Sequence, residues 1–235
     1  METLERFLRK NLQIGIRQVR IILSSTELRI NGQSCDNPKQ LISPFCRIEK
    51  DGIVLRDRAR RVIMVYKPQG LVSATRDHLH STVLSLIQEP WAPELHFAGR
   101  LDRFTTGLVI LTNDSRFSEA ITQPKSVIGK RYYVETEQEI PREAILEFEK
   151  GVWLEKEKIQ THPAQVEWVN DTICRLTIYE GKHHQVKRMF ARWNCRVKVL
   201  HREAIGNLML PEDLSSGEWR TLTPAEELEA LQRED

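Results

Sequence analysis

The chain has 235 residues, of which 40% are hydrophobic and 29% are charged, and its formal net charge is +2. This length supplies enough apolar side chains for one medium-sized domain and a small one. The sequence contains no run of about 18 apolar residues, which argues against a membrane-spanning helix. The first ten residues mix acidic and basic side chains and lack an apolar segment, which argues against a secretory signal.

The cysteine and histidine patterns argue against a metal centre. The four cysteines, Cys35, Cys46, Cys174 and Cys195, are widely spaced and form no Cys-x-x-Cys pair. This spacing is typical of reduced, mostly buried thiols, so we expect a cytoplasmic protein. His183 and His184 are neighbours, and adjacent side chains of a regular helix cannot both face one ion. We therefore reject a zinc site.

The small net charge conceals an uneven distribution. Residues 1–62 contain 13 basic and 7 acidic side chains, whereas the rest of the chain contains 22 basic and 26 acidic ones. A basic module joined to a near-neutral body is typical of a polyanion-binding appendage. An ordinary solubilising distribution of charge is the alternative interpretation.

The first 60 residues predict a small module of helices and short strands. Apolar residues at positions 4, 7 and 8, and again at 14, 19, 22 and 23, recur at helical spacing on either side of Gly15. Residues 27–32 predict a strand that enters the Asn31-Gly32 turn, and further strands are expected around a second turn at 51–52. The arginine-rich segment 56–61 is expected to be a solvated linker.

The remaining residues predict a larger α+β domain. Strands are expected at 62–66, 108–111, 132–136, 164–169, 173–179 and 197–201, and helices at 115–122, 141–151, 184–193 and 224–232. The last helix has Thr223 as its N-cap, Pro224 in its first position and Glu226 in its third, which is a capping-box start. Because strands and helices do not alternate regularly, we expect a mixed, largely antiparallel sheet. We place the two domains at 1–58 and 62–235.

The most informative segment is 96–114. There Gly99-Arg100-Leu101-Asp102 leads through a Thr-Thr-Gly run into an apolar strand, which places Asp102 on a loop at the mouth of a sheet. An aspartate in such a position is most often a turn former, so Asp102 by itself is ambiguous.

The wider pattern resembles the pseudouridine synthases of the RsuA/RluA superfamily. Five motifs occur in the order found in that family: MVYKPQGLVSAT, GRLD with TTGLVILTND, KRYYVET, YEGKHHQVKRMF and GEWRTLTPAEE. The resemblance implies the catalytic-domain fold of the superfamily, an rRNA substrate, a catalytic role for Asp102 and no cofactor. The HQVKRMF run at 184–190 points to the RsuA branch, which modifies small-subunit (16S) rRNA, free or in an assembling 30S particle. A large-subunit (23S) enzyme and a catalytically silent rRNA-binding assembly factor are the alternatives.

The N-terminal module resembles the small RNA-binding domain named after ribosomal protein S-four, also called the alpha-L domain. The Ser-Arg-Arg that is usual at its second helix appears here as Gly15-Ile16-Arg17-Gln18. The resemblance implies that Arg17 and Arg20 contact RNA phosphates. We expect the protein to be a monomer.

The resemblance also implies roles for residues around Asp102. Lys187 is expected to be the cationic partner of its carboxylate, with Arg188 as second choice, because neighbours on a helix point about 100° apart. Tyr132 is expected to stack on the target base, with Tyr133 on the opposite face of the strand. Arg100 is expected to bind the substrate by holding the flipped nucleotide. Gln185 is expected to support the site through a hydrogen bond to the backbone.

The reaction explains why a carboxylate is needed. Pseudouridine formation breaks the bond between uracil and ribose, turns the base and rejoins it through a ring carbon. A carboxylate can attack the anomeric carbon and form a covalent adduct, or it can remove a sugar proton so that a glycal forms. The sequence leaves both routes open. A carbohydrate hydrolase would need a second carboxylate, and no motif supplies one.

Overall fold

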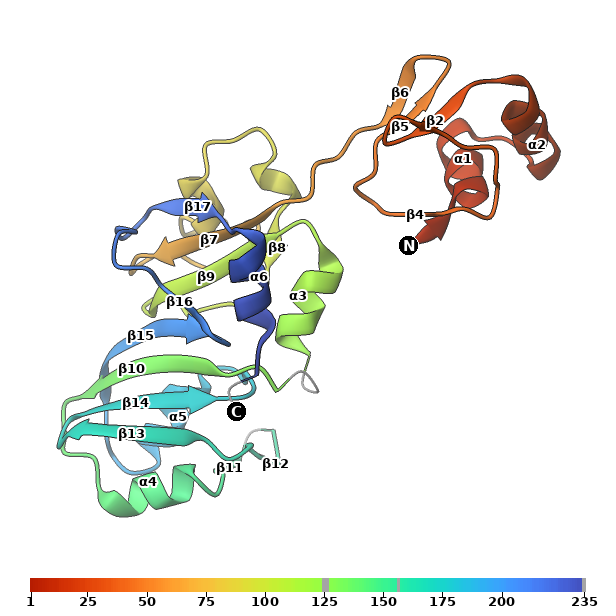
Figure 1. Cartoon of the computed structure of the whole chain (residues 1–235). Helices are drawn as coiled ribbons and strands as arrows, with labels where there is room; N and C mark the ends of the chain where they lie inside the picture. The colour runs from red at the N-terminus through yellow and green to blue at the C-terminus, as the bar shows by residue number, and fades with distance from the viewer. Residues whose placement is uncertain (124–126, 156, 234–235) are drawn as a thin grey trace. The chain divides into compact units, whose positions relative to one another are not determined.

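The computed structural model describes residues 1–123, 127–155 and 157–233. They form two compact units, Met1–Arg60 and Arg61–Asp235, which are described separately (Figure 1). Among the helices in these ranges, none combines the length and the apolar character needed to cross a membrane.

The first unit packs two helices against short strands. Its elements are β1 (Glu2–Thr3), α1 (Leu4–Leu12), α2 (Ile16–Ser25), β2 (Leu28–Ile30), β3 (Gln33–Ser34), β4 (Leu41–Ile42), β5 (Ile48–Lys50) and β6 (Ile53–Arg56). The strands β3, β2, β5 and β6 form one sheet, and β1 pairs with β4. Asn31 and Gly32 both have positive φ, as a two-residue hairpin turn between β2 and β3 requires. The predicted helices and hairpin are therefore confirmed.

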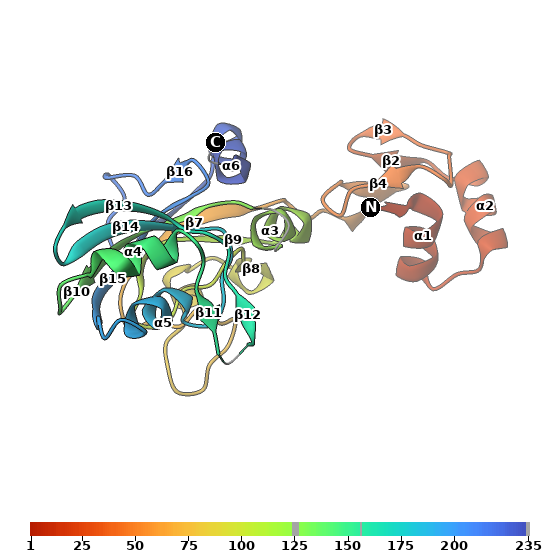
Figure 2. The same cartoon turned by 90° about the horizontal axis from the view of Figure 1, so that it is seen from below.

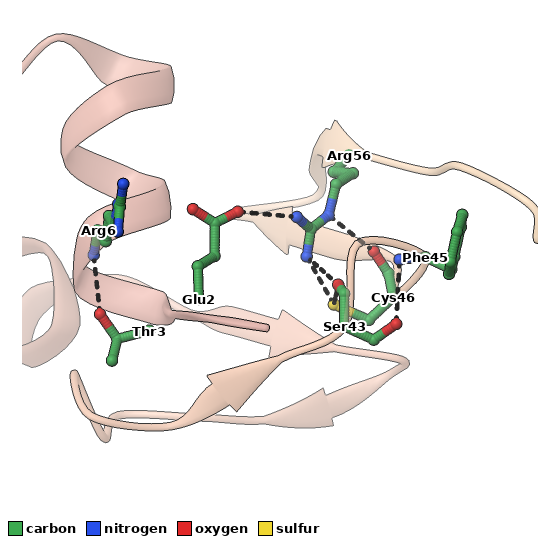
Figure 3. Close-up of polar contacts among 7 residues, drawn as sticks. All are labelled: Glu2, Thr3, Arg6, Ser43, Phe45, Cys46 and Arg56. Atoms are coloured by element: carbon green, nitrogen blue, oxygen red, sulfur yellow. Dashed lines mark hydrogen bonds and ion pairs between the residues drawn. The ribbon is translucent and has the colours of Figure 1, made fainter. Parts of the chain in front are cut away.

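The expectation that segment 56–61 is a solvated linker is wrong at both of its ends. Arg56 lies in β6, where its guanidinium donates to the carbonyls of Ser43 (2.6 Å) and Cys46 (3.2 Å) and lies 3.4 Å from the Glu2 carboxylate (Figure 3). In the second unit, the Arg61 guanidinium lies 4.2 Å from the centre of the Trp91 ring. Arginine has a long apolar stem and five donors, so it can be packed and bonded where composition alone predicts solvent.

The second unit is built on one mixed sheet. Its strands are β7 (Val62–Lys67), β8 (His96–Phe97), β9 (Thr106–Thr112), β10 (Lys130–Thr136), β13 (Gln165–Asn170), β14 (Ile173–Ile178), β15 (Val197–Ile205), β16 (Leu208–Met209) and β17 (Trp219–Thr221). The main path runs β13-β14-β10-β15-β9-β7-β17, and β9 and β15 are paired in parallel while their neighbours are antiparallel. A separate two-stranded ribbon joins β11 (Trp153–Leu154) to β12 (Ile159–Gln160). The predicted α+β class with a mixed sheet is confirmed.

Both faces of this sheet are buried where β7 and β9 lie. Alternate residues of β7 point to opposite sides, with Ile63 and Val65 in one core and Val62 and Met64 in the other. The first core is covered by α4 (Arg142–Phe148) and α5 (Gln185–Ala191), and the second by α3 (Ser115–Thr122) and α6 (Pro224–Leu231). Figure 2 shows α5 and α6 on opposite sides of the sheet. Two cores explain why residues 62–65 of β7 and 108–111 of β9 are continuously apolar.

Some short elements were not predicted. The strands β8, β16 and β17 have two or three residues each, which is too short for a period-two pattern to be recognised. They form because the longer strands β9, β15 and β7 offer them hydrogen-bonding edges. Their existence therefore depends on tertiary pairing.

Candidate active site

Asp102 lies on the loop between β8 and β9. The loop turns sharply, since the Thr105 amide donates to the Asp102 carbonyl at 3.1 Å. The buried Ser73 hydroxyl fixes the preceding residue, because it accepts from the Leu101 amide and donates to the Leu101 carbonyl. The Asp102 side chain is 29% exposed, so the carboxylate is partly open to solvent.

Lys67, at the end of β7, holds the other side of this loop. It is fully buried, and its ammonium donates to the carbonyls of Pro68, Arg103 and Thr105 at 2.8–3.1 Å. Burial lowers the pKa of Lys67 to about 8, while the nearby Asp102 charge opposes this shift. Lys67 belongs to the first of the five sequence motifs, but the motif by itself gives this lysine no role. A fully buried lysine beside a candidate carboxylate becomes visible only in the folded chain.

Arg202, in β15, is a second buried cation at the site. It is 2% exposed, and its guanidinium donates to the carbonyls of Leu108 (2.7 Å) and Gly99 (3.1 Å) and contacts the Tyr132 hydroxyl at 3.5 Å. Its backbone lies directly against Gly107, where an added Cβ would be 2.2 Å from the Arg202 carbonyl oxygen. The parallel pairing of β9 and β15 creates this contact, which no sequence motif indicated.

Asp102, Tyr132 and Arg202 line one cavity. Its volume is about 360 Å³, within the range of small-ligand sites, and it is lined by Arg100, Asp102, Lys130, Tyr132, His184 and Arg202, among others. Tyr132 is buried, and Tyr133 is on the opposite face of β10. Arg100 is exposed at the cavity. The structure thus brings three of the predicted site residues, Asp102, Tyr132 and Arg100, to one place.

Positive charge dominates the buried part of this cavity. Lys130 is 8% exposed and donates to the carbonyls of Ile121 and Ile128, and burial lowers its pKa to about 8. Together with the buried Arg202 beneath Tyr132, it makes the site attractive to an anionic ligand such as a nucleotide phosphate.

His184 is a close neighbour of Asp102 that the sequence analysis missed. Its Nε2 lies 3.5 Å from Asp102 Oδ1, and its ring stacks on His183 with centroids 3.9 Å apart. The backbone of His184 is left-handed, with φ 51° and ψ 33°. The sequence analysis considered the two histidines only as a metal pair on a regular helix. The left-handed residue before α5 breaks the helical geometry on which that argument depended.

Gln185 lines a smaller cavity together with Arg100, Asp102 and Tyr132, whereas the other predicted site residues lie elsewhere. Lys187 lines a neighbouring cavity with Gln69 and Phe104, although it is close enough to Lys67 to influence that ammonium. Gln185 is buried and donates to Glu180. Its side-chain oxygen also accepts from the Lys182 amide at 3.0 Å.

Arg188 forms a two-pronged ion pair with Glu157, with contacts of 2.6 and 2.8 Å. Arg17 and Arg20 belong to the first unit, where both are exposed on α2.

Comparison with known proteins identifies the class. Residues 61–192 match the family model described as RNA pseudouridylate synthase. The chain is 41% identical over 224 residues to ribosomal small subunit pseudouridine synthase A of Pseudomonas aeruginosa, and 40% identical to the protein of that name from Escherichia coli K12. Each alignment covers 95% of this chain and 97% of the relative. A crystal structure of a pseudouridylate synthase superposes with a TM-score of 0.71 at 35% identity, covering 98% of this chain and all of that one.

The fold and the sequence therefore define an isomerase that acts on RNA. The chain belongs to the RNA pseudouridylate synthase family. The predicted family and the predicted enzyme class are both confirmed.

Proposed function

We propose that this enzyme converts a specific uridine of small-subunit (16S) ribosomal RNA to pseudouridine. The proposal is supported by relatives about 40% identical over nearly the whole chain, each named for the small ribosomal subunit. The substrate is the rRNA itself or an assembling small-subunit particle.

One observation carries the catalytic assignment. Asp102 combines partial exposure with a loop held on both sides, by Ser73 and by Lys67, and its side chain shares a cavity with Tyr132. A carboxylate that reacts with a ribose has to be accessible to the sugar and fixed in orientation. Partial exposure on a loop that is held on both sides meets both requirements. We therefore propose Asp102 as the catalytic carboxylate.

Two chemical routes are open to Asp102. In the first, the carboxylate attacks C1′ as the bond to N1 breaks, and a covalent adduct holds the sugar while the base turns. In the second, the carboxylate removes a proton from the sugar and a glycal forms. In both routes the uracil stays in the cavity and returns through C5.

We propose supporting roles for the neighbouring residues. Tyr132 stacks on the flipped base, which has lost its neighbours in the RNA, and Arg202 holds the tyrosine in place. Arg100, exposed at the rim, holds the nucleotide out of the RNA stack. Lys187 contributes positive charge from the adjacent cavity, and Gln185 orders the turn at Lys182.

We assign Arg188 no contact with the substrate, because its guanidinium is engaged by Glu157.

We further propose that residues 1–58 form an S-four-like RNA-binding domain and that 62–235 is the catalytic domain. The first unit has a core of its own, and Arg17 and Arg20 are exposed on α2 beside it. A monomeric state and a cytoplasmic location stay predictions.

The catalytic assignment is tested with Asp102→Asn. This variant is expected to form no pseudouridine while its affinity for rRNA stays within a few-fold of the wild type, since the amide is close in size to the carboxylate. Asp114→Asn is a matched control, because Asp114 follows the same β9 strand and caps α3. Product formation by Asp102→Asn would contradict the assignment.

The target is tested in cells. Pseudouridines are mapped in the 16S and 23S rRNA of a strain that lacks this protein and of the same strain with the gene restored. We expect one 16S site to be lost and regained. Loss of a 23S site instead would contradict the small-subunit assignment.

A further inference from the structure

The isomerisation requires a proton to move from one atom of the base to another. When the uracil rejoins the ribose through C5, that carbon briefly carries both its original hydrogen and the new bond to C1′. The hydrogen must leave as a proton, its electron pair must restore the C5–C6 double bond, and N1 must gain a proton. A group in the cavity has to accept the first proton, and a proton donor has to serve N1.

His184 is placed for this transfer. Its ring is 47% exposed, lines the same cavity as Tyr132, and has Nε2 3.5 Å from the Asp102 carboxylate. Imidazole is the side chain that most readily takes up and releases a proton near neutral pH. Asp102 has to reach the ribose, and C5 forms its new bond to C1′ of that ribose. A group beside the Asp102 carboxylate is therefore close to C5 when this bond forms.

The backbone around His184 indicates that this placement is held against a conformational cost. A left-handed φ of 51° is uncommon for residues other than glycine, although histidine adopts it more often than most, as asparagine and aspartate do. The conformation is secured by the first hydrogen bond of α5, from the Arg188 amide to the His184 carbonyl, and by stacking on His183.

Three other charged groups of the cavity are already engaged. Lys130 donates to two carbonyls, and the Arg202 guanidinium donates to two carbonyls and does not give up its proton in proteins. The Glu180 carboxylate accepts from Gln185 and from the His162 amide. The half-exposed imidazole beside Asp102 is therefore the better proton carrier.

We propose that His184 carries the proton from C5 to N1. Neutral imidazole accepts the proton on Nε2 as the C5–H bond breaks. The electrons of that bond form the C5–C6 double bond, and the electron pair of the C6–N1 double bond moves to N1. The imidazolium, stabilised by Asp102, then returns the proton to N1. The histidine ends as it began, and no oxidant, reductant or co-reactant is consumed. This inference rests on the proposed role of Asp102.

The test compares His184→Asn with His183→Asn in the full-length protein. Asparagine tolerates the left-handed backbone and cannot carry a proton. Single-turnover rates are measured on rRNA with hydrogen or deuterium at C5 of the target uridine. We expect His184→Asn to lower the rate roughly 10²-fold or more and to raise the deuterium isotope effect, because C5 deprotonation becomes the slow step.

The control separates proton transfer from local packing. His183→Asn keeps the polar surface but removes the stacking partner, and it is expected to leave the isotope effect unchanged. His184→Gln is the second variant, for use if His184→Asn lowers the melting temperature. A wild-type rate in the His184 variants, or a slower rate with a wild-type isotope effect, would overturn the inference. Activity of Asp102→Asn would instead overturn the proposed function.

Discussion

At the scale of single residues, the buried charge of Lys67 supports the Asp102 loop at an energetic cost. Its three carbonyl partners include Arg103 and Thr105, which belong to the Asp102 loop. Burial lowers the pKa of Lys67 to about 8 in the folded protein, from 10.5 for an exposed lysine. Between these pH values the unfolded chain binds more protons than the folded one, so the Lys67 contribution to stability rises with pH.

The variant Lys67→Met tests whether the contribution of Lys67 to stability rises with pH. The difference in unfolding free energy between wild type and variant is expected to shift in favour of the wild type by about 1–2 kcal/mol between pH 7 and pH 10. Urea unfolding at several pH values measures it. Lys150→Met, which alters an exposed lysine of the same unit, should show no such shift. If the difference in unfolding free energy between wild type and Lys67→Met does not change with pH, the prediction is contradicted.

Gly107 is the residue of β9 that pairs with Arg202 of β15. It has φ +107°, and an added Cβ would lie 2.2 Å from the Arg202 carbonyl oxygen. Gly107→Ala therefore combines backbone strain with a clash, and we expect it to cost more than about 2 kcal/mol of stability. Gly70, with φ +95° and nothing within 4 Å of an added Cβ, provides the control. Equal losses for Gly70→Ala and Gly107→Ala would show that the close approach is unimportant.

At the scale of elements, α6 shows how a local motif specifies a helix. The Thr223 hydroxyl accepts from the Glu226 amide, and the Glu226 carboxylate accepts from the Thr223 amide at 2.8 Å, as the capping box predicted. The carboxylate also binds Arg220 of the adjacent strand at 2.6 and 2.9 Å. The hydrogen bond from Arg220 is the main reason that the pKa of Glu226 is lowered to about 2.

Glu226→Gln should therefore destabilise the protein in a pH-dependent way. The lowered pKa means that Glu226 contributes its full stabilisation above about pH 4.5 and loses it as the pH falls towards 2. We expect the variant to lose about 1–2 kcal/mol of unfolding free energy at pH 7, and we expect this loss to become smaller below pH 4.5. Urea unfolding between pH 7 and pH 3 measures the difference. Glu143→Gln, in the first turn of α4, is the control, because α4 has no side-chain cap. A loss independent of pH would contradict the prediction.

At the scale of the whole molecule, the division into two units separates the proposed catalytic site from the proposed RNA anchoring. The cavity with Asp102 belongs to the second unit, whereas Arg17 and Arg20 belong to the first. Phosphate contacts by these arginines would release counterions from the RNA, so they should be visible in the salt dependence of binding.

The double variant Arg17→Gln/Arg20→Gln tests this role in the full chain. We expect weaker rRNA binding and a slope of log K against log salt that is shallower by about 2, with the rate at saturating RNA little changed. Arg29→Gln is a matched control in the same unit, because Arg29 is already paired with Glu27 at 2.6 Å. A salt slope equal to that of the wild type would argue against RNA contacts at these positions.

Much of the fold was predictable from the sequence because its signals are local. Helical periodicity marked α1 and α2, a capping box marked α6, and an Asn-Gly pair marked the first hairpin. Asp102 was identified because its neighbours form a contiguous motif. These features depend on residues a few positions apart, whose spacing is visible in the chain itself.

Only the tertiary structure decided how the site is assembled around that aspartate. Lys67, Arg202 and His184 reach the site from different strands and loops, and the parallel pairing of β9 with β15 places Arg202 against Gly107. The left-handed backbone at His184 turns a residue from an apparent helix towards the carboxylate. Such contacts follow from sheet order and packing between distant segments, and burial in that packing lowers the pKa of Lys67. The sequence by itself therefore determined which carboxylate to examine, and the fold decided which groups surround it.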